Sequence, residues 1–147
     1  MRVLIVTTRY GEGLGGKENY LVALTAALTH RGHLVRVVTR ADDAFFEFSG
    51  HRRFTASRPA LTRTHAAQVH LLRLSGWARL WARPAWRLHF YRWTFPLAAG
   101  LFARAAGPEL SAHVAWSDVV HYDGTGRELL GHAALRQCQK YGKALVV

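Results

Sequence analysis

A glycine-rich stretch near the N-terminus has the residue types best suited to chemistry. Residues 11–16, with the sequence GEGLGG, follow a continuous apolar run and precede a segment with helical periodicity. Free backbone N–H groups and the dipole at a helix N-terminus favour anions, and glycines let a phosphate approach the backbone closely. The pattern therefore predicts contact with a phosphate or a sugar-phosphate. The simpler alternative is a glycine turn that binds no ligand.

The same glycines fit a second kind of site. Gly11, Gly13 and Gly16 have the G-x-G-x-x-G spacing of dinucleotide-binding domains. Two departures stand against it. Additional residues before the first glycine lengthen the loop, and Thr39-Arg40 stands where an acidic residue would hold the ribose. Arg40 suits a 2′-phosphate instead, so an NAD(P)-binding Rossmann domain stays open as an alternative.

Hydrophobic periodicity predicts the elements that must position this loop. Buried strands alternating with helices indicate an α/β fold, a Rossmann-like three-layer domain with a parallel sheet of about five strands. We expect residues 41–67 to be irregular and residues 75–106 to be largely helical, broken at Pro84 and Pro96. The expected strands cover residues 2–8, 34–39, 69–74, 118–121 and 144–147, and the expected helices cover residues 17–31 and 125–141.

Capping residues predict where these helices begin and end. Gly32 and Gly142 are expected to stop the first and the last helix. Thr125 and Glu128 have the spacing of a capping box, so the last helix should begin there. The residues of that helix expected to face inward are Leu130, Ala134, Cys138 and Tyr141.

Several segments of the chain follow one another in the order of a known family. Residues 15–24 (GGKENYLVAL), 31–33 (RGH) and 37–39 (VVT) form a glycine loop ending in GG-x-E, a helix, R-G-H and a valine-rich strand. Residues 118–121 (DVVH) and 142–147 (GKALVV, with alanine in place of a proline) continue the series. Together they resemble the N-terminal half of family 4 glycosyltransferases, and the middle of the chain matches only weakly.

The resemblance implies a GT-B fold, in which two Rossmann-like domains face each other across a cleft. Such enzymes transfer a sugar from a nucleotide-sugar to an acceptor, including lipid-linked acceptors, with retention of anomeric configuration. They need neither a metal ion nor a dinucleotide cofactor. On this basis we expect residues 1–147 to be the acceptor-side domain of a hexosyltransferase-type enzyme, truncated before a donor-binding C-terminal domain. The chain alone should be inactive, because contacts to the leaving diphosphate lie in the other half.

The resemblance also implies where ligands meet this half, although it assigns no catalytic residue here. The simpler structural alternative places Asp123 in a turn and makes His121 a buried, hydrogen-bonded residue. The expected donor phosphate and sugar loop comprises Gly13, Gly15, Gly16, Lys17 and Glu18. The expected acceptor pocket comprises Arg9, Tyr10, His121, Tyr122, Asp123 and Gly124.

The middle of the chain is strongly basic and aromatic. From residue 48 to residue 108 there are ten arginines and no aspartate or glutamate. Such a charge attracts anions, and interleaved tryptophan suits a membrane interface. Our hypothesis is docking on an anionic membrane surface. The alternative is that an aromatic stripe from Trp86 to Leu101 packs on the sheet and leaves the arginines in solvent. The residues of the expected docking segment are Trp77, Arg79, Trp81, Arg83, Trp86, Arg87, Arg92 and Trp93.

Other features bound the function. The single cysteine excludes a disulfide framework, and the nine histidines lack the spacing of metal ligands, so no metal site is expected. No nucleic-acid-binding motif accompanies the basic charge, which disfavours nucleic acid as a partner. The sequence shows no signal peptide and no long apolar run, so a cytoplasmic protein, peripheral on the inner face of the cell membrane, is expected. A non-catalytic membrane-docking subunit of a split glycosyltransferase remains a further alternative.

Overall fold

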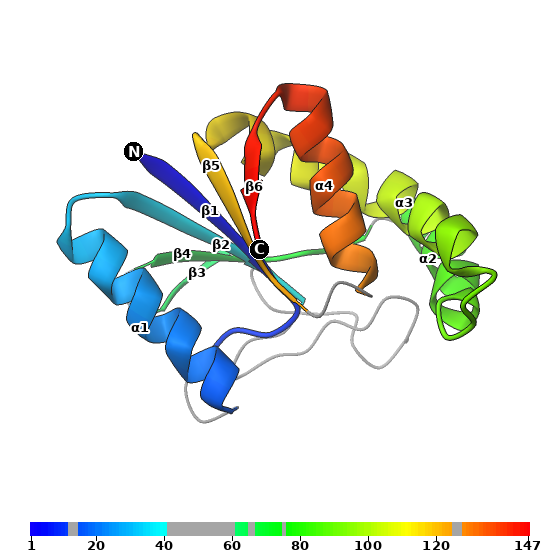
Figure 1. Cartoon of the computed structure of the whole chain (residues 1–147), viewed down its shortest axis with the longest axis horizontal. Helices are drawn as coiled ribbons and strands as arrows, with labels where there is room; N and C mark the ends of the chain where they lie inside the picture. The colour runs from blue at the N-terminus through cyan, green and yellow to red at the C-terminus, as the bar shows by residue number, and fades with distance from the viewer. Residues whose placement is uncertain (12–14, 41–60, 65–66, 75, 125–127) are drawn as a thin grey trace.

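A computed structural model describes residues 1–11, 15–40, 61–64, 67–74, 76–124 and 128–147 of the 147-residue chain (Figure 1). The strands are β1 (Arg2–Thr7), β2 (Leu34–Thr39), β3 (Leu61–Thr64), β4 (Ala67–Leu71), β5 (Val119–Asp123) and β6 (Ala144–Val146). The helices are α1 (Gly16–His30), α2 (Gly76–Leu88), α3 (Phe95–Trp116) and α4 (Leu129–Tyr141).

The strands form one mixed sheet in the order β3-β4-β2-β1-β5-β6. Neighbours from β4 to β6 pair in parallel, and β3 pairs antiparallel with β4 at the edge. This arrangement confirms the α/β, Rossmann-like fold with five parallel strands. The expectation of irregular backbone up to residue 67 is wrong for residues 61–64, which form β3. A short edge strand needs no continuous apolar run, so the periodicity gave little sign of it.

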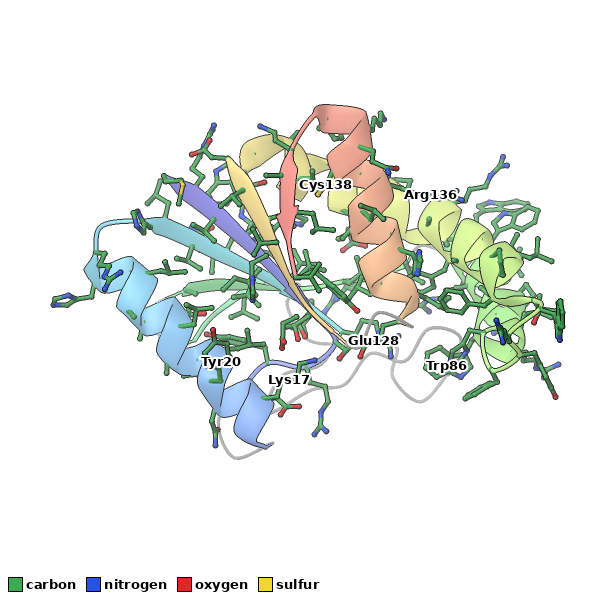
Figure 2. All side chains as sticks on the ribbon, viewed as in Figure 1. Lys17, Tyr20, Trp86, Glu128, Arg136 and Cys138 are labelled. Atoms are coloured by element: carbon green, nitrogen blue, oxygen red, sulfur yellow. The ribbon has the colours of Figure 1, made fainter. Side chains whose placement is uncertain are left out.

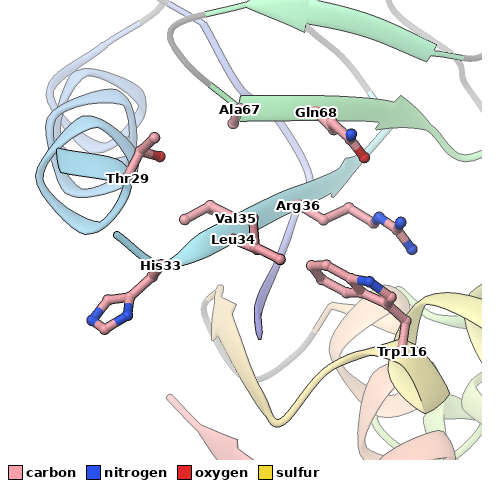
Figure 3. Close-up of a pocket in the computed structure, with 8 residues that line it drawn as sticks. All are labelled: Thr29, His33, Leu34, Val35, Arg36, Ala67, Gln68 and Trp116. Carbon is pink, nitrogen blue, oxygen red and sulfur yellow. The ribbon is translucent and has the colours of Figure 1, made fainter. Parts of the chain in front are cut away.

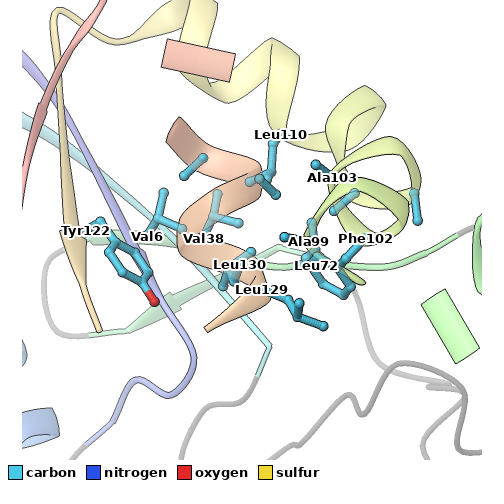
Figure 4. Close-up of a cluster of buried hydrophobic side chains, with 14 of the residues drawn as sticks. Val6, Val38, Leu72, Ala99, Phe102, Ala103, Leu110, Tyr122, Leu129 and Leu130 are labelled. Atoms are coloured by element: carbon cyan, nitrogen blue, oxygen red, sulfur yellow. The ribbon is translucent and has the colours of Figure 1, made fainter. Parts of the chain in front are cut away.

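Helices cover both faces of the sheet, which makes the domain three layers thick (Figure 1). The side chains of β1 alternate between the faces: Val3 and Ile5 pack with α1, whereas Leu4 and Val6 pack with α3 and α4. Figure 4 shows the larger of these two clusters, which is centred on Phe102 and Leu110 of α3. Each fully buried aliphatic or aromatic side chain contributes about 1.5–3 kcal/mol through loss of apolar surface from water.

The basic segment folds as a helical hairpin whose break differs from the expected one. Pro84 lies inside α2, so the expected break at this residue is wrong. Ala82 and Ala85, on either side of it, are buried against α3, and this packing holds the helix together despite the lost backbone donor. Pro96 stands in the first turn of α3, where the missing N–H costs nothing. The chain leaves helical geometry over residues 89–94, so no continuous stripe runs from α2 into α3.

Glycines end α1 and α4 where the sequence predicts, whereas the predicted capping box does not mark the start of α4. Gly32 has a φ of +81° and Gly142 a φ of +62°, a left-handed geometry that ends each helix as expected. The start of α4 is at Leu129 rather than near residue 125, and Thr125 lies outside the described residues. Tyr141 is exposed, so its expected inward position is wrong, whereas the other three expected inward residues are buried.

Candidate functional site

The sheet has a point where the chain leaves neighbouring strands in opposite directions. β1 continues toward β2 on one side, and β5 continues toward β6 on the other. Thr7, the last residue of β1, is level with Thr39 of β2 and with Asp123 of β5. Open parallel sheets bind ligands in the crevice beyond the strand ends at such a switch point. The loop that follows β1 and the residues that end β5 therefore border the candidate site.

The first turn of α1 faces this edge of the sheet. Gly15 precedes the helix, and Gly16 and Lys17 form its first turn. The side chain of Glu18 folds back over Gly15, so that a Cβ at Gly15 would lie 2.8 Å from the Glu18 Oε2 atom. The glycine leaves room for this carboxylate, and a larger residue would require the flexible end of the Glu18 side chain to shift. In the GG-x-E pattern, the side chain of Glu18 therefore lies against the first glycine, Gly15.

Two ion pairs hold charged groups around this turn. Lys17 Nζ lies 3.3 Å from Asp123 Oδ2, which joins α1 to the end of β5. Arg9 Nε lies 3.7 Å from Glu18 Oε1, and Arg9 is the more exposed partner. Figure 2 shows Lys17 on the side of the molecule where the parallel strands end. Both cations are partly exposed, so each can exchange its carboxylate partner for an anionic ligand at small cost.

The end of β5 contains polar atoms that lack hydrogen-bond partners. His121 Nε2 and Asp123 Oδ2 are both buried, and neither has a hydrogen bond within the described part of the chain. Asp123 Oδ2 has only its ion pair with Lys17. A buried polar group without a partner costs roughly 1–3 kcal/mol, so such groups commonly await a ligand or water. An imidazole and a carboxylate close in sequence on one strand suit the hydroxyl groups of a sugar. The simpler alternative, in which His121 is a buried and hydrogen-bonded residue, is not supported at its Nε2 atom, for which the described residues supply no partner.

Tyr122 supports this edge from the opposite face of the sheet. Its ring is 3% exposed, and its hydroxyl donates a 2.8 Å hydrogen bond to Glu128 Oε2. Burial, followed by the hydrogen bond to Glu128, raises the pKa of Tyr122. Cβ atoms at Gly124 and Gly131 would lie 1.9 Å and 2.5 Å from the tyrosine, so both glycines make room for it. Glu128 bonds to Tyr122 and makes no side-chain cap hydrogen bond at the start of α4.

The remaining sequence-predicted residues of the two ligand regions have different positions. Tyr10 is fully buried and packs with Ile5 and Leu21, so it supports the loop from within the core. Gly124 follows β5 and is half-buried. Gly13 lies outside the described residues. The structure therefore brings Gly15, Gly16, Lys17, Glu18, Arg9, His121 and Asp123 to one edge of the sheet, with Tyr10 and Tyr122 beneath it.

Arg40 bears on the dinucleotide alternative. It follows β2 at the position where a 2′-phosphate would be recognised, yet it is only 6% exposed. Its guanidinium carbon lies 5.1 Å from the centre of the Trp86 ring. A cation stacked on an indole and shielded from solvent is poorly placed to meet a cofactor phosphate.

A cleft lies at the other end of the parallel strands, where β2 and β4 begin (Figure 3). The sequence did not predict it. Its volume is about 410 Å³, and its walls include Arg36 of β2, Gln68 of β4 and Trp116 of α3. The guanidinium carbon of Arg36 lies 4.0 Å from the centre of the Trp116 ring. These residues come from three separate elements with no common motif, so no local pattern could have indicated their meeting.

Two histidines lie beside that arginine. The rings of His70 and His113 meet edge to face at 4.6 Å, and Arg36 Nη1 lies 3.4 Å from His113 Nδ1. Burial lowers the pKa of His113 to about 4, with His70 and Arg36 adding to the effect. Burial and then Arg36 also lower the pKa of His70. Both rings are therefore neutral at neutral pH.

The residues of the expected docking segment divide by exposure. Trp77, Trp81 and Trp93 are exposed, whereas Trp86 is half-buried and reaches Arg40. Arg79 is half-buried as well. The exposed arginines of the segment are Arg83, Arg87 and Arg92.

Neither a metal centre nor a membrane span is found among the residues that the structure describes. They include no group of three or more histidine, cysteine or carboxylate side chains placed to hold a metal ion. None of the described helices is long and apolar enough to cross a bilayer. Comparison of the sequence with models of known protein families gives no match, and comparison with curated proteins gives none either.

Proposed function

We propose that this chain is the acceptor-binding half of a retaining glycosyltransferase, which transfers a sugar from a nucleotide-sugar to an acceptor. The observation that carries the proposal is the contact between Lys17 and Asp123 at the switch point of the sheet. It joins the glycine turn into α1, which resembles the glycosyltransferase family, to the end of β5, whose residues 119–121 belong to the second resembling segment. Both segments border the edge where α/β domains bind ligands.

The charges at this edge suit the two ligands of such a reaction differently. The N-terminus of α1 and the ammonium group of Lys17 favour a donor phosphate. His121 and Asp123 have buried atoms with no hydrogen bond to any described residue, and they suit the hydroxyl groups of an acceptor sugar. Glycosyl transfer develops negative charge on the leaving diphosphate, so fixed positive charge near it lowers the barrier. This half would supply positioning and part of that field, and the donor-binding half would supply the rest.

Transfer by the natural polypeptide tests the proposal directly. The protein would be purified from its own cells and incubated with a panel of nucleotide-sugars and with sugar or lipid acceptors. We expect a hexose to be transferred with retained anomeric configuration, as seen by mass spectrometry and proton NMR. The 147-residue chain alone should give no transfer. Turnover by that chain alone, or none by the natural polypeptide with any donor, would contradict the proposal.

The mass of the natural polypeptide distinguishes the proposal from the alternative of a split glycosyltransferase. A second Rossmann-like domain in the same polypeptide would bring the mass to roughly twice that of this chain. A mass close to that of this chain would instead favour a split enzyme, in which a separate subunit binds the donor.

Binding to the isolated chain separates the proposal from the dinucleotide alternative. In two-dimensional NMR, a nucleoside diphosphate sugar should shift the amides of Gly15, Gly16 and Lys17. NADP should cause no stronger shifts and none at Arg40, because that side chain is buried under Trp86. Micromolar binding of NADP with shifts at Arg40 would favour the dinucleotide alternative.

A further inference from the structure

The outer side of α2 and the turn into α3 expose large aromatic side chains. Trp77 is 80% exposed and Trp93 is 92% exposed, and Trp81, Phe90 and Tyr91 are exposed as well. Indole rings are ordinarily well buried, because each removes a large apolar area from water. With their neighbouring arginines they form the α2–α3 surface, which consists of Trp77, Trp81, Arg83, Arg87, Phe90, Tyr91, Arg92 and Trp93.

The packing of α2 leaves two of its three tryptophans, Trp77 and Trp81, exposed, whereas Trp86 is half-buried against the core. Its buried residues are Ala82 and Ala85, which contact the cluster formed with α3. Trp77, Trp81 and Arg83 are exposed. A helix that served only to cover the core would turn its indoles inward and leave its alanines in solvent. In Figure 2 this end of the molecule carries large side chains that point away from the sheet. Such an apolar surface marks an interaction site.

The charge of the surface points to an anionic partner. Arg83, Arg87 and Arg92 are exposed, and the sequence has no acidic residue from residue 48 to residue 108. A second copy of the chain would present the same positive charge, which opposes self-association through this surface. Guanidinium groups match phosphate geometry, and indoles prefer the headgroup level of a bilayer.

A cleft beside Trp77 and Trp81 adds further guanidinium groups to this surface. It lies between α2 and α3, has a volume of about 300 Å³ and is also lined by Arg73, Arg104 and Glu109. Glu109 Oε1 accepts a 2.9 Å hydrogen bond from the backbone N–H of Arg73. The Nε and Nη2 atoms of Arg73 are buried and have no hydrogen-bond partner within the described residues. The guanidinium carbon of Arg104 lies 5.7 Å from the centre of the Trp81 ring. A phosphate oxygen would satisfy the Nε and Nη2 donors of Arg73, for which the described residues supply no acceptor.

We propose that the α2–α3 surface docks the protein on a bilayer of anionic lipid, with a lipid phosphate in the cleft between Arg73 and Arg104. The exposed indoles enter the headgroup region and the arginines contact lipid phosphates. Trp86 links this surface to Arg40 at the end of β2, so docking brings the ligand edge of the sheet toward the membrane. The inference goes beyond the proposed sugar transfer and does not depend on it.

Sedimentation with lipid vesicles tests the docking. The protein would be mixed at low salt with vesicles of phosphatidylcholine and phosphatidylglycerol, or of phosphatidylcholine alone. We expect binding to the anionic vesicles that weakens as salt is added and is far weaker on the neutral ones. Arg83→Glu with Arg87→Glu should weaken binding by roughly tenfold or more, since each arginine near the surface contributes about fivefold. Trp77→Ala with Trp93→Ala should weaken it similarly, and Arg104→Ala should weaken it through loss of the cleft.

Matched variants elsewhere keep the test specific. Tyr20→Ala removes an exposed aromatic group from α1, and Arg31→Glu reverses an exposed charge beyond α1, at the end of the molecule away from α2. Both should bind vesicles as the unmodified protein does. All substituted residues are exposed, so circular dichroism should show an unchanged fold in every variant. Equal binding to neutral vesicles, no binding to anionic ones, or unchanged binding by the arginine and tryptophan variants would overturn the inference.

Discussion

Lys17 Nζ lies 3.3 Å from Asp123 Oδ2, so the first turn of α1 is joined to the end of β5 at the switch point of the sheet. The two residues are distant in the sequence: Lys17 lies within the glycine-turn segment of the resemblance, and Asp123 lies two residues after its DVVH segment. Their contact fixes the distance between the glycine turn and the strand that ends in His121 and Asp123. It also places the ammonium group of Lys17, which can exchange Asp123 for another anion, where a donor phosphate would bind.

Lys17→Ala should therefore impair ligand binding more than stability. The ion pair is partly exposed, so its loss should lower the free energy of unfolding by less than about 1 kcal/mol. Loss of a charge-assisted contact should weaken binding of a nucleoside diphosphate sugar by roughly tenfold. An NMR titration measures the affinity, and Lys140→Ala, an exposed lysine on α4, serves as the control. Equal affinity in the two variants would remove Lys17 from the site.

Gly131→Ala should destabilise the domain although alanine favours helices. Its Cβ would lie 2.5 Å from the ring of Tyr122, which is packed between the sheet and α4. We expect the free energy of unfolding to fall by about 1–3 kcal/mol, as measured by urea denaturation. Gly100→Ala in α3 is the matched control, because its Cβ would meet only Arg136 at an ordinary 3.8 Å. That control should be neutral or stabilising by up to about 1 kcal/mol. Destabilisation of the same size in both would argue against the contact with Tyr122.

Tyr122→Phe should remove one hydrogen bond and one source of alkaline instability. Loss of the bond to Glu128 should lower the free energy of unfolding by about 1–3 kcal/mol near neutral pH. The pKa of Tyr122 is raised above its ordinary value of 10.0, so the folded state holds this proton more tightly than the unfolded chain does. The stability that Tyr122 contributes is thus complete below pH 10.0 and is lost as the pH rises further.

Urea denaturation above and below that pH, in both proteins, measures this effect. The unmodified protein should lose more stability than Tyr122→Phe does on the alkaline side. Glu128→Gln and the double variant complete a cycle, in which a coupling energy near zero would show that the two side chains do not interact.

Acid should destabilise the protein through the buried histidine pair. The pKa of His113 is about 4 in the folded state and 6.5 ordinarily. Between about pH 4 and pH 6.5, His113 is therefore protonated in the unfolded chain but neutral in the folded state. Stability therefore falls as the pH drops from 6.5 to about 4. Because the ring is only partly buried, we expect this contribution to be on the order of 1–2 kcal/mol.

His113→Phe tests this contribution, since it keeps an aromatic ring beside His70 but cannot be protonated. Its stability should change less over the acid range than that of the unmodified protein. Gln139→Ala, which alters an exposed uncharged residue of α4, should leave the pH profile unchanged. An identical acid slope in the His113 variant would assign the loss to carboxylates instead.

Local pattern was enough to predict most of the fold. Continuous apolar runs gave β1, β2 and β5, and the periodicity of residues 17–31 gave α1, since each depends on near neighbours in the chain. Gly32 and Gly142 stopped their helices because a left-handed φ is cheap only for glycine. The edge strand β3 and the persistence of α2 through Pro84 were missed, because both depend on contacts with distant elements.

The candidate site was predicted in part. The glycine turn and the end of β5 were expected at the ligand edge, since parallel strands bring their carboxyl ends together. The burial of Tyr10 and Tyr122 was not foreseen, because a tyrosine after a strand looks the same in the sequence whether it faces solvent or the core. The cluster of Arg36, His70 and His113 also left no local sign.

The sequence by itself determined β1, β2, β5, α1, the glycine stops and the basic charge of the middle segment, because these follow from short-range sterics, periodicity and composition. Only the tertiary structure decided which groups meet: that Lys17 reaches Asp123, that Glu128 bonds to Tyr122 rather than to its own helix, and that α2 buries alanines while Trp77 and Trp81 stay in solvent. The reason is physical. Burial and pairing depend on the area and charge that another element presents, and those are set by the packing of the whole chain.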